Sequence, residues 1–220
     1  NGSGTITAMW QRDSAAFNVL PNSADCKLIF HWNPTATAVV GPPALAQTRF
    51  RDGRENVRVD ALDIDIGALR TWVNAAWATR KVKVMYVEFY NVPVGRYPAV
   101  RLLNAAQLPG TEPTPTPMSA YGLTVATHAP IYVKGNFNYL ATGLTNWKPA
   151  ALVADAIIFQ SPNWNDNTNG GAYGVNPESY LAAGGFSAAS TMYVYAAVAA
   201  GHSPTICDWQ TAGCSGVKPW

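Results

Sequence analysis

Hydrophobic and polar residues alternate strictly over Leu62–Ile66, where Asp63 and Asp65 separate three aliphatic residues. A period of two positions predicts a half-buried strand, or an extended entry into the segment that follows. In either case the two carboxylates lie on the polar face and the aliphatic side chains on the buried one.

A helical pattern follows this alternation. Apolar residues recur at helical spacing over Leu69–Trp77, which predicts an amphipathic helix over residues 67–80. Asp65 stands near the predicted N-terminus, and Arg80 and Lys81 stand near the predicted C-terminus. These charges match the helix dipole, which favours anions at the first turn and cations at the last.

Short apolar runs between turn residues make up most of the remaining pattern. Such short strands do not suit a sandwich of ordinary strands, but they suit a parallel β-helix, in which each coil stacks on the next. We therefore expect a mainly β fold with minor α, either a short-stranded β-helix-like coil or a mixed sheet with one packed amphipathic helix. No strict sequence period is present, so an α+β sheet is the alternative. The predicted strands comprise residues 26–32, 82–90, 99–103, 123–127, 131–134, 151–154 and 156–160.

The periodicity divides the chain at residue 50. Residues 1–49 are the least periodic, and we expect an irregular N-terminal segment that belongs to a larger upstream structure. Residues 50–220 are expected to form a β-rich domain that includes the helix near 67–80. Within it, Thr191–Ala200 is apolar and compatible with a strand that passes into a helix. We expect the chain to be a fragment of a longer protein.

Composition narrows the class of protein. Apolar residues make up 48% of the chain, enough for a core, whereas charged residues make up only 13%, about half the usual share. Low charge is common in secreted and cell-surface β-proteins. The net charge of +2 is spread along the chain, which argues against nucleic acid as a partner. No apolar run is long enough to span a membrane.

The chain has three cysteines. Cys207 and Cys214 flank a turn-like segment, so a local disulfide is sterically feasible and fits an oxidising compartment. Cys26 would then be free, buried or paired with a partner outside this chain. The spacings offer too few ligands for a cysteine metal site.

An Asn-rich loop contains the candidate metal ligands. Asn165, Asn167 and Asn169 occupy the first, third and fifth positions of a calcium-loop pattern, with a glycine at the sixth. Asp155 is an additional candidate ligand. The first position lacks its usual carboxylate and the twelfth lacks its glutamate, so a solvated Asn/Gly turn is the alternative.

Catalytic patterns are weak in this sequence. Asp63 and Asp65 lie about 7 Å apart by strand rise, a separation used in glycoside hydrolysis, yet strand alternation explains them fully. Ser187 lies near a nucleophile-elbow pattern that lacks its final glycine. The histidines show no metal-ligand spacing; they are His31, His128 and His202. We therefore expect no enzymatic activity and no required cofactor.

Aromatic and charged residues suggest two further features. Trp164, Tyr173 and Tyr180 lie near the polar loop and are candidates for stacking on sugar rings, with core packing as the alternative. The charged group at Arg51–Asp52 and Arg54–Glu55 is better explained by ion pairing at the base of the fold than by catalysis.

Several separated segments fit one family pattern. They resemble the C-terminal ectodomain of large bacterial surface proteins linked to type IV pilus assembly, many of which carry a PilX-like N-terminal helix. The match covers about residues 50–205. The most specific pieces are Leu123-Thr-Val-Ala-Thr127, Pro130-Ile-Tyr-Val-Lys-Gly-Asn-Phe-Asn138 and Pro149-Ala-Ala-Leu-Val-Ala-Asp155 with its Asn-Trp-Asn-Asp166 continuation; the other segments are 50–55, 62–69, 100–104 and 196–205.

The resemblance implies an extracellular, cell-surface location and association with a pilus or secretion machine, with no defined reaction. The leading hypothesis is a non-enzymatic structural or adhesive module. One alternative is a carbohydrate-binding β-rich domain, with carbohydrate cleavage less favoured. Another is a subunit of an extracellular filament that stacks through exposed strand edges. Expected partners are pilus or secretion-machine proteins and surface glycans.

Overall fold

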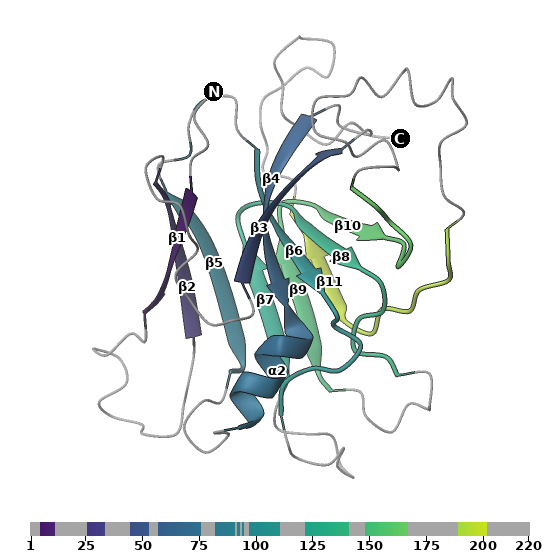
Figure 1. The fold of residues 1–220 in the computed structure, drawn as a ribbon. Coiled ribbons are helices and arrows are strands. Elements are labelled where there is room, and N and C mark those ends of the chain that lie inside the picture. Colours follow the sequence, from purple (N-terminus) through teal and green to yellow (C-terminus); the bar gives the residue numbers. More distant parts are fainter. Residues whose placement is uncertain are drawn as a thin grey trace.

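The computed structural model describes two β-sheets and one helix (Figure 1). The fold is therefore mainly β with minor α, as the sequence predicts. The described residues are 5–11, 26–33, 45–52, 57–75, 82–90, 92, 94, 97–110, 122–140, 148–166 and 189–201.

The first sheet has six strands in the order β1-β2-β5-β7-β9-β11. β1 and β2 pair antiparallel, and every later pair in this sheet is parallel. The strands are β1 (Thr5–Gln11), β2 (Cys26–Asn33), β5 (Val84–Tyr90), β7 (Leu123–Thr127), β9 (Ala150–Ala154) and β11 (Ala197–Ala200).

The second sheet has five strands in the order β10-β8-β6-β4-β3. β3 and β4 pair antiparallel, and the other pairs are parallel. The strands are β3 (Leu45–Asp52), β4 (Val57–Asp65), β6 (Tyr97–Leu103), β8 (Ile131–Lys134) and β10 (Ile157–Gln160).

From β4 onward the chain alternates between the sheets. Even-numbered strands join the five-stranded sheet and odd-numbered strands join the six-stranded one. β5 pairs with β2, and from β6 onward each new strand pairs with the strand two places earlier. The spacing between paired residues changes from turn to turn: Val59 pairs with Tyr97, Val100 with Ile131, and Ile131 in turn with Ile157. This irregular spacing explains why the sequence shows no strict period.

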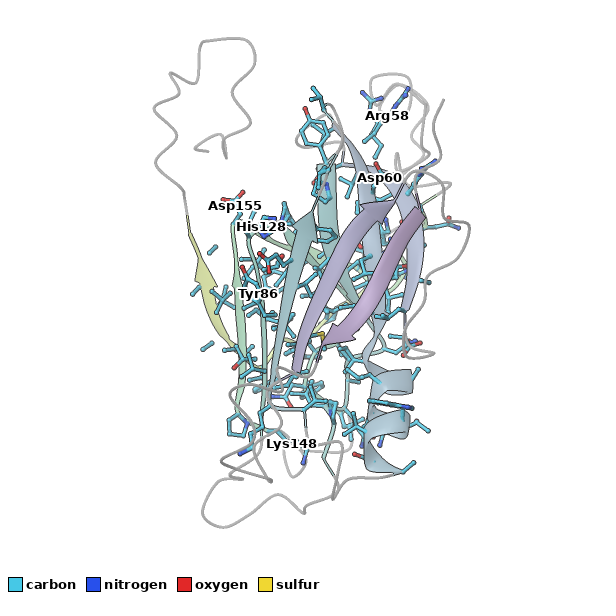
Figure 2. All side chains as sticks on the ribbon, turned by 90° about the vertical axis from the view of Figure 1, so that its left-hand side faces the viewer. Arg58, Asp60, Tyr86, His128, Lys148 and Asp155 are labelled. Atoms are coloured by element: carbon cyan, nitrogen blue, oxygen red, sulfur yellow. The ribbon has the colours of Figure 1, made fainter. Side chains whose placement is uncertain are left out.

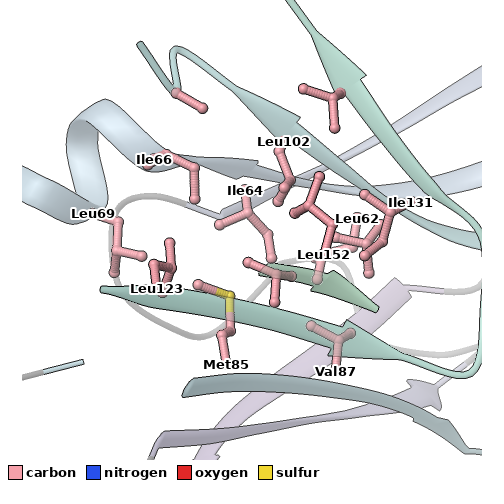
Figure 3. Packing of buried hydrophobic residues seen from close by; sticks show 14 of the residues in the cluster. Leu62, Ile64, Ile66, Leu69, Met85, Val87, Leu102, Leu123, Ile131 and Leu152 are labelled. Atoms are coloured by element: carbon pink, nitrogen blue, oxygen red, sulfur yellow. The ribbon is translucent and has the colours of Figure 1, made fainter. Parts of the chain in front are cut away.

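The main core lies between the two sheets. Side chains from the two layers point toward one another in Figure 3, where Leu62 and Leu102 of the five-stranded sheet face Met85 and Leu152 of the six-stranded one. All four are fully buried. Alternation along each strand puts their neighbours on the outer faces of the sheets.

The helix α2 (Ile66–Asn74) follows β4 directly and lies at the lower end of the sheets in Figure 1. It buries Ile66, Leu69 and Val73 against the main core. The helix is shorter than predicted, because Ala75 forms its C-cap. Residues 76–81 lie outside the described part. Arg80 and Lys81 therefore cannot be assigned to a last turn.

The strand predictions are otherwise close to the observed bounds, with one correction. Thr191–Ala200 does not pass from a strand into a helix: residues 191–196 carry a single bridge, Val194 with Phe137, and Ala197–Ala200 form β11. β1, β2 and most of β3 come from residues 1–49, so this segment contributes strands to both sheets. The predicted domain division at residue 50 stays a prediction.

Candidate functional site

The outer face of the five-stranded sheet carries a second buried cluster, separate from the main core. It places an aromatic ring pair, Phe50 of β3 and Tyr132 of β8, edge to face with centroids 4.9 Å apart. The hydroxyl of Tyr132 donates to Asp52 at 2.5 Å. This face is therefore covered rather than open, although it points away from the space between the sheets.

Arg101 of β6 lies in the middle of this cluster. Its Nε and Nη2 donate to the two carboxylate oxygens of Asp63, both at 2.8 Å. Nη1 donates to Asp166 at 2.7 and 2.9 Å, and Nη2 also donates to the hydroxyl of Thr48 at 2.8 Å. Arg101 therefore binds Asp63 through two parallel N–H···O bonds, the geometry that a guanidinium offers to a carboxylate, and reaches Asp166 and Thr48 with its other nitrogens.

Burial makes this arrangement energetically important. Arg101 is 3% exposed and Asp63 is 4% exposed, and the guanidinium lies 4.9 Å from the ring centre of Phe50. Burial alone would lower the pKa of Arg101, but hydrogen bonds and charge from Asp63 and Asp166 outweigh it, and the pKa is raised. The residue is therefore a permanent cation held between two carboxylates.

The two paired carboxylates of the sequence prediction have separate structural roles. Asp63 binds Arg101, whereas Asp65 is the N-cap of α2, where it accepts from the N–H of Ala68 at 2.8 Å. Asp65 also accepts from the side-chain amide of Asn104. Both carboxylates thus accept hydrogen bonds from groups of the protein itself.

The calcium candidates are only partly described. Asp155 lies in the turn between β9 and β10, while Asn165 follows β10; Asn167 and Asn169 lie outside the described residues. The neighbouring Asp166 is occupied by Arg101 and by the indole N–H of Trp164 at 2.8 Å. Within the described ranges no group of three His, Cys, Asp or Glu side chains could hold a metal. The calcium loop stays a prediction.

A second group of connected side chains lies at the end of the segment Pro130–Asn138. Asn138 has φ 56° and is 1% exposed. Its side-chain N–H groups donate to the carbonyls of Lys148 and Tyr195 at 2.6 and 2.8 Å, and its Oδ1 accepts from the N–H of Lys148 at 2.9 Å. One amide thereby joins the segments after β8, before β9 and before β11.

Three tyrosines gather around this junction. The ring of Tyr139 lies 4.3 Å from that of Tyr193 and 5.4 Å from that of Tyr195, nearly parallel to the latter. Tyr193 is 45% exposed and Tyr195 is 39% exposed. Their backbone is fixed by hydrogen bonds to Phe137 and Asn136. We call these three residues the tyrosine group.

The aromatic residues that the sequence suggested for stacking on sugar rings are not those of the tyrosine group. Trp164 is described, but its N–H is bound to Asp166, and Tyr173 and Tyr180 lie outside the described residues. Reasoning from the sequence also missed Arg101 as a site residue. The available signal was a single arginine inside an apolar strand, because a buried charge requires a buried partner.

The remaining candidates do not converge on these sites in the part of the chain that the structure describes. His128 is exposed and lies edge to face with Phe89 at 6.1 Å, and Figure 2 labels it at one end of the sheets. Of the predicted charge cluster, only Arg51 and Asp52 are described. The other positions lie outside the description or have undescribed side chains: Ser187, His31, His202, Arg54, Glu55, Cys26, Cys207 and Cys214.

Comparison with protein-family models, curated proteins and solved structures gave no match. Among the described helical residues, none form a helix long and apolar enough to cross a membrane. The resemblance to pilus-associated ectodomains therefore rests on the sequence motifs alone.

Proposed function

We propose that this chain is a non-enzymatic, extracellular structural and adhesive module of a type IV pilus-associated surface protein. We infer that its strands form stacked coils of a β-helix-like scaffold. The observation that carries this proposal is the alternation of strands between two sheets with parallel pairing in each. Such a stack presents its turns on a rigid framework, where surface loops are free to vary and bind.

The buried charges support a scaffold role. Arg101 joins β6 to β4 through Asp63, to β3 through Thr48, and to the segment after β10 through Asp166. Removing one partner from a buried ion pair is far more costly than the pair is stabilising. Charge placed in this way links four segments of the chain.

Deletion of the gene tests the proposal. Cells that lack the gene are expected to carry fewer pili, or to attach less well to surfaces, and complementation with the full gene should restore both. Pili are counted by electron microscopy and adherent cells by plate counts. Normal piliation together with normal attachment in the deletion strain would contradict the proposed function.

Carbohydrate binding is a second candidate, favoured by the tyrosine group. Exposed aromatic rings on a fixed backbone can stack on the apolar face of a pyranose ring, since tyrosine combines a large apolar surface with a polar tip. A glycan array with the purified protein should give hits that Tyr195→Ala removes and Tyr195→Phe, which keeps the ring, retains. An array without hits would remove this candidate.

A further inference from the structure

Two rows of main-core side chains become exposed at β10 and β11, the last strands of their sheets (Figure 1). In the five-stranded sheet Val133 is fully buried, whereas Phe159, which pairs with it, is 47% exposed. In the six-stranded sheet Leu152 is fully buried, whereas Val198, which pairs with it, is 49% exposed. Contact of both exposed side chains with further apolar surface would therefore be favourable.

The strands β10 and β11 also lack the features that keep sheet edges from pairing. Neither strand contains a charged residue, a proline or a glycine. In the part of the chain that the structure describes, no further strand pairs with either of them. By contrast β3, at the other edge of the five-stranded sheet, contains Arg49, Arg51 and Asp52. Edge strands that stay unpaired commonly carry such charges, so β10 and β11 have the character of edges that receive a partner.

The backbone of β10 is oriented to pair on its outer side. The carbonyl of Gln160 accepts from the N–H of Gly135, which follows β8, so the polar groups of Gln160 point toward β8. Successive residues of a strand direct their N–H and C=O groups to opposite sides. Ile157 and Phe159 therefore direct these groups away from β8, toward the edge.

The backbone of β11 has the same orientation. The N–H of Gly201, the residue after β11, donates to the carbonyl of Ala154 of β9. By the same alternation, Val198 and Ala200 direct their N–H and C=O groups away from β9. Each edge thus offers two residues that can exchange hydrogen bonds with a partner strand.

The two edges are level with each other along the strand direction. β10 begins three residues after the end of β9, and β11 runs parallel to β9 and ends beside the end of β9. Ile158 is the second residue from this end in β10, and Ala199 is the second residue from this end in β11. A single two-fold axis perpendicular to the sheets can therefore pass beside both residues.

A second copy of this chain is the partner that fits both edges at once. A single peptide strand would pair with one edge and leave the other row exposed, whereas a second copy presents two edges at the same separation. A two-fold contact places a surface patch against itself, so like charges in these strands would face each other and repel. The absence of charge from β10 and β11 removes that repulsion.

We propose that this chain forms a closed two-fold dimer in which β10 and β11 each pair antiparallel with the same strand of a second copy. Both sheets then continue from one copy into the other. Head-to-tail growth into a filament is disfavoured, because it would place the uncharged β10 against the charged edge at β3. The proposal is independent of the adhesive function proposed above.

The axis fixes the register of the pairing. In β10, Ile157 lies opposite Phe159 of the second copy, and in β11, Val198 lies opposite Ala200 of the second copy. These are the residues whose N–H and C=O groups point outward, so each pair exchanges two hydrogen bonds. The same pairs place an apolar side chain beside each exposed one.

Sedimentation equilibrium of the purified chain, from about 1 μM to about 1 mM, tests the proposal. We expect a reversible equilibrium between monomer and dimer, without larger species. Phe159→Lys removes an interfacial ring and adds a charge in each copy, so the dissociation constant should rise about 10-fold or more. Val153→Lys is the control, because Val153 has a similar exposure, 41%, but lies on the outer face of β9. It should leave the dissociation constant unchanged.

Val198→Lys repeats the test on the other edge, in case Phe159→Lys fails to fold by circular dichroism. It is expected to weaken the dimer to a similar extent. A wild-type chain that stays monomeric over the whole range, or that forms species larger than dimers, would overturn the proposal. A dimer that survives the lysine changes at both edges, or that Val153→Lys disrupts, would also overturn it, because the contact would lie elsewhere.

Cysteine cross-linking tests the register directly. Ala199 lies opposite its own counterpart in a pair without mutual hydrogen bonds, the type in which side chains are closest. Ala199→Cys should therefore give a dimer on a non-reducing gel that reductant removes. Ala197→Cys lies on the same face of β11, but about 13 Å from its counterpart along the strands. It should cross-link no more than the wild-type chain, which measures the native cysteines. Equal cross-linking of the two variants would contradict the register.

Discussion

Arg101 illustrates how a single side chain can hold distant segments together. The strand β6 positions it opposite Asp63 in the register of the parallel pair, and Asp166 reaches it from beyond β10. The sequence alone indicates that an arginine in an apolar strand needs a partner. It does not indicate which of several aspartates that partner is, because the choice depends on strand register.

Replacement of Arg101 by Met is expected to lower the free energy of unfolding by about 3–5 kcal/mol, since it leaves two carboxylates with an unpaired buried charge. Arg101→Lys keeps the charge but cannot supply five fixed donors, so an intermediate loss is expected. Urea unfolding monitored by tryptophan fluorescence measures both. A loss below about 1 kcal/mol for Arg101→Met would show that the ion cluster is not stabilising.

The sign of the pH dependence follows from the raised pKa of Arg101. Its contribution is fully present below the ordinary pKa of arginine and is lost only as the pH rises through the raised value. The stability difference between wild type and Arg101→Met should therefore stay constant between about pH 6 and 10. A difference that declines steadily across this range would contradict a permanently charged Arg101.

Asn138 and Asn104 allow a matched comparison of two variants, because both residues have a positive φ angle, 56° and 52° respectively. Glycine accepts this conformation without strain, so Asn→Gly isolates the loss of side-chain hydrogen bonds. Asn138→Gly loses the three hydrogen bonds of a buried side chain and should cost about 2–4 kcal/mol, whereas Asn104→Gly loses one exposed bond to Asp65 and should cost less than about 1 kcal/mol. Thermal unfolding of the two variants compares them; equal losses would contradict the role given to Asn138.

At the scale of elements, local patterns predicted most strands and misplaced the helix end. β7 and β8 have the predicted bounds because their short apolar runs are bordered by turn residues. The apolar spacing at Ala76 and Trp77 extended the predicted helix beyond Asn74. Periodicity detects an apolar face but not the point at which the chain must leave the helix to reach the other sheet.

The contact between β7 and the start of β9 offers an element-scale test. A Cβ on Gly122 would lie 1.9 Å from the carbonyl oxygen of Pro149, which accepts from the N–H of Leu123. Gly122→Ala must displace this backbone and should cost about 1–3 kcal/mol or more. Gly201→Ala is the control, since a Cβ there meets nothing within 4 Å. Comparable melting temperatures for the two variants would refute the close approach.

At the scale of the whole molecule, the sequence predicted the mainly β class but not the arrangement of the sheets. Alternation within a strand tells which side chains are buried, yet it does not assign neighbouring strands. The unequal steps from Val59 to Tyr97 and from Ile131 to Ile157 hide the repeat that a regular coil would reveal. The sequence did not predict the tyrosine group, because Tyr139 and Tyr193 are far apart along the chain and come into contact only in the folded structure.

The calcium loop, the disulfide between Cys207 and Cys214, and the surface location stay predictions from sequence. Among these, location bears most directly on the proposed function, because an adhesive module must be exposed on the outside of the cell. The low charge of 13% is compatible with that location.

Immunogold electron microscopy of intact cells, with antibodies raised against this chain, tests the central claim most directly. The deletion strain provides the control for background labelling. The account predicts gold particles on the surface of unpermeabilised cells, concentrated at pili or at their bases. Labelling that appears only after permeabilisation, with none on the intact surface, would contradict it.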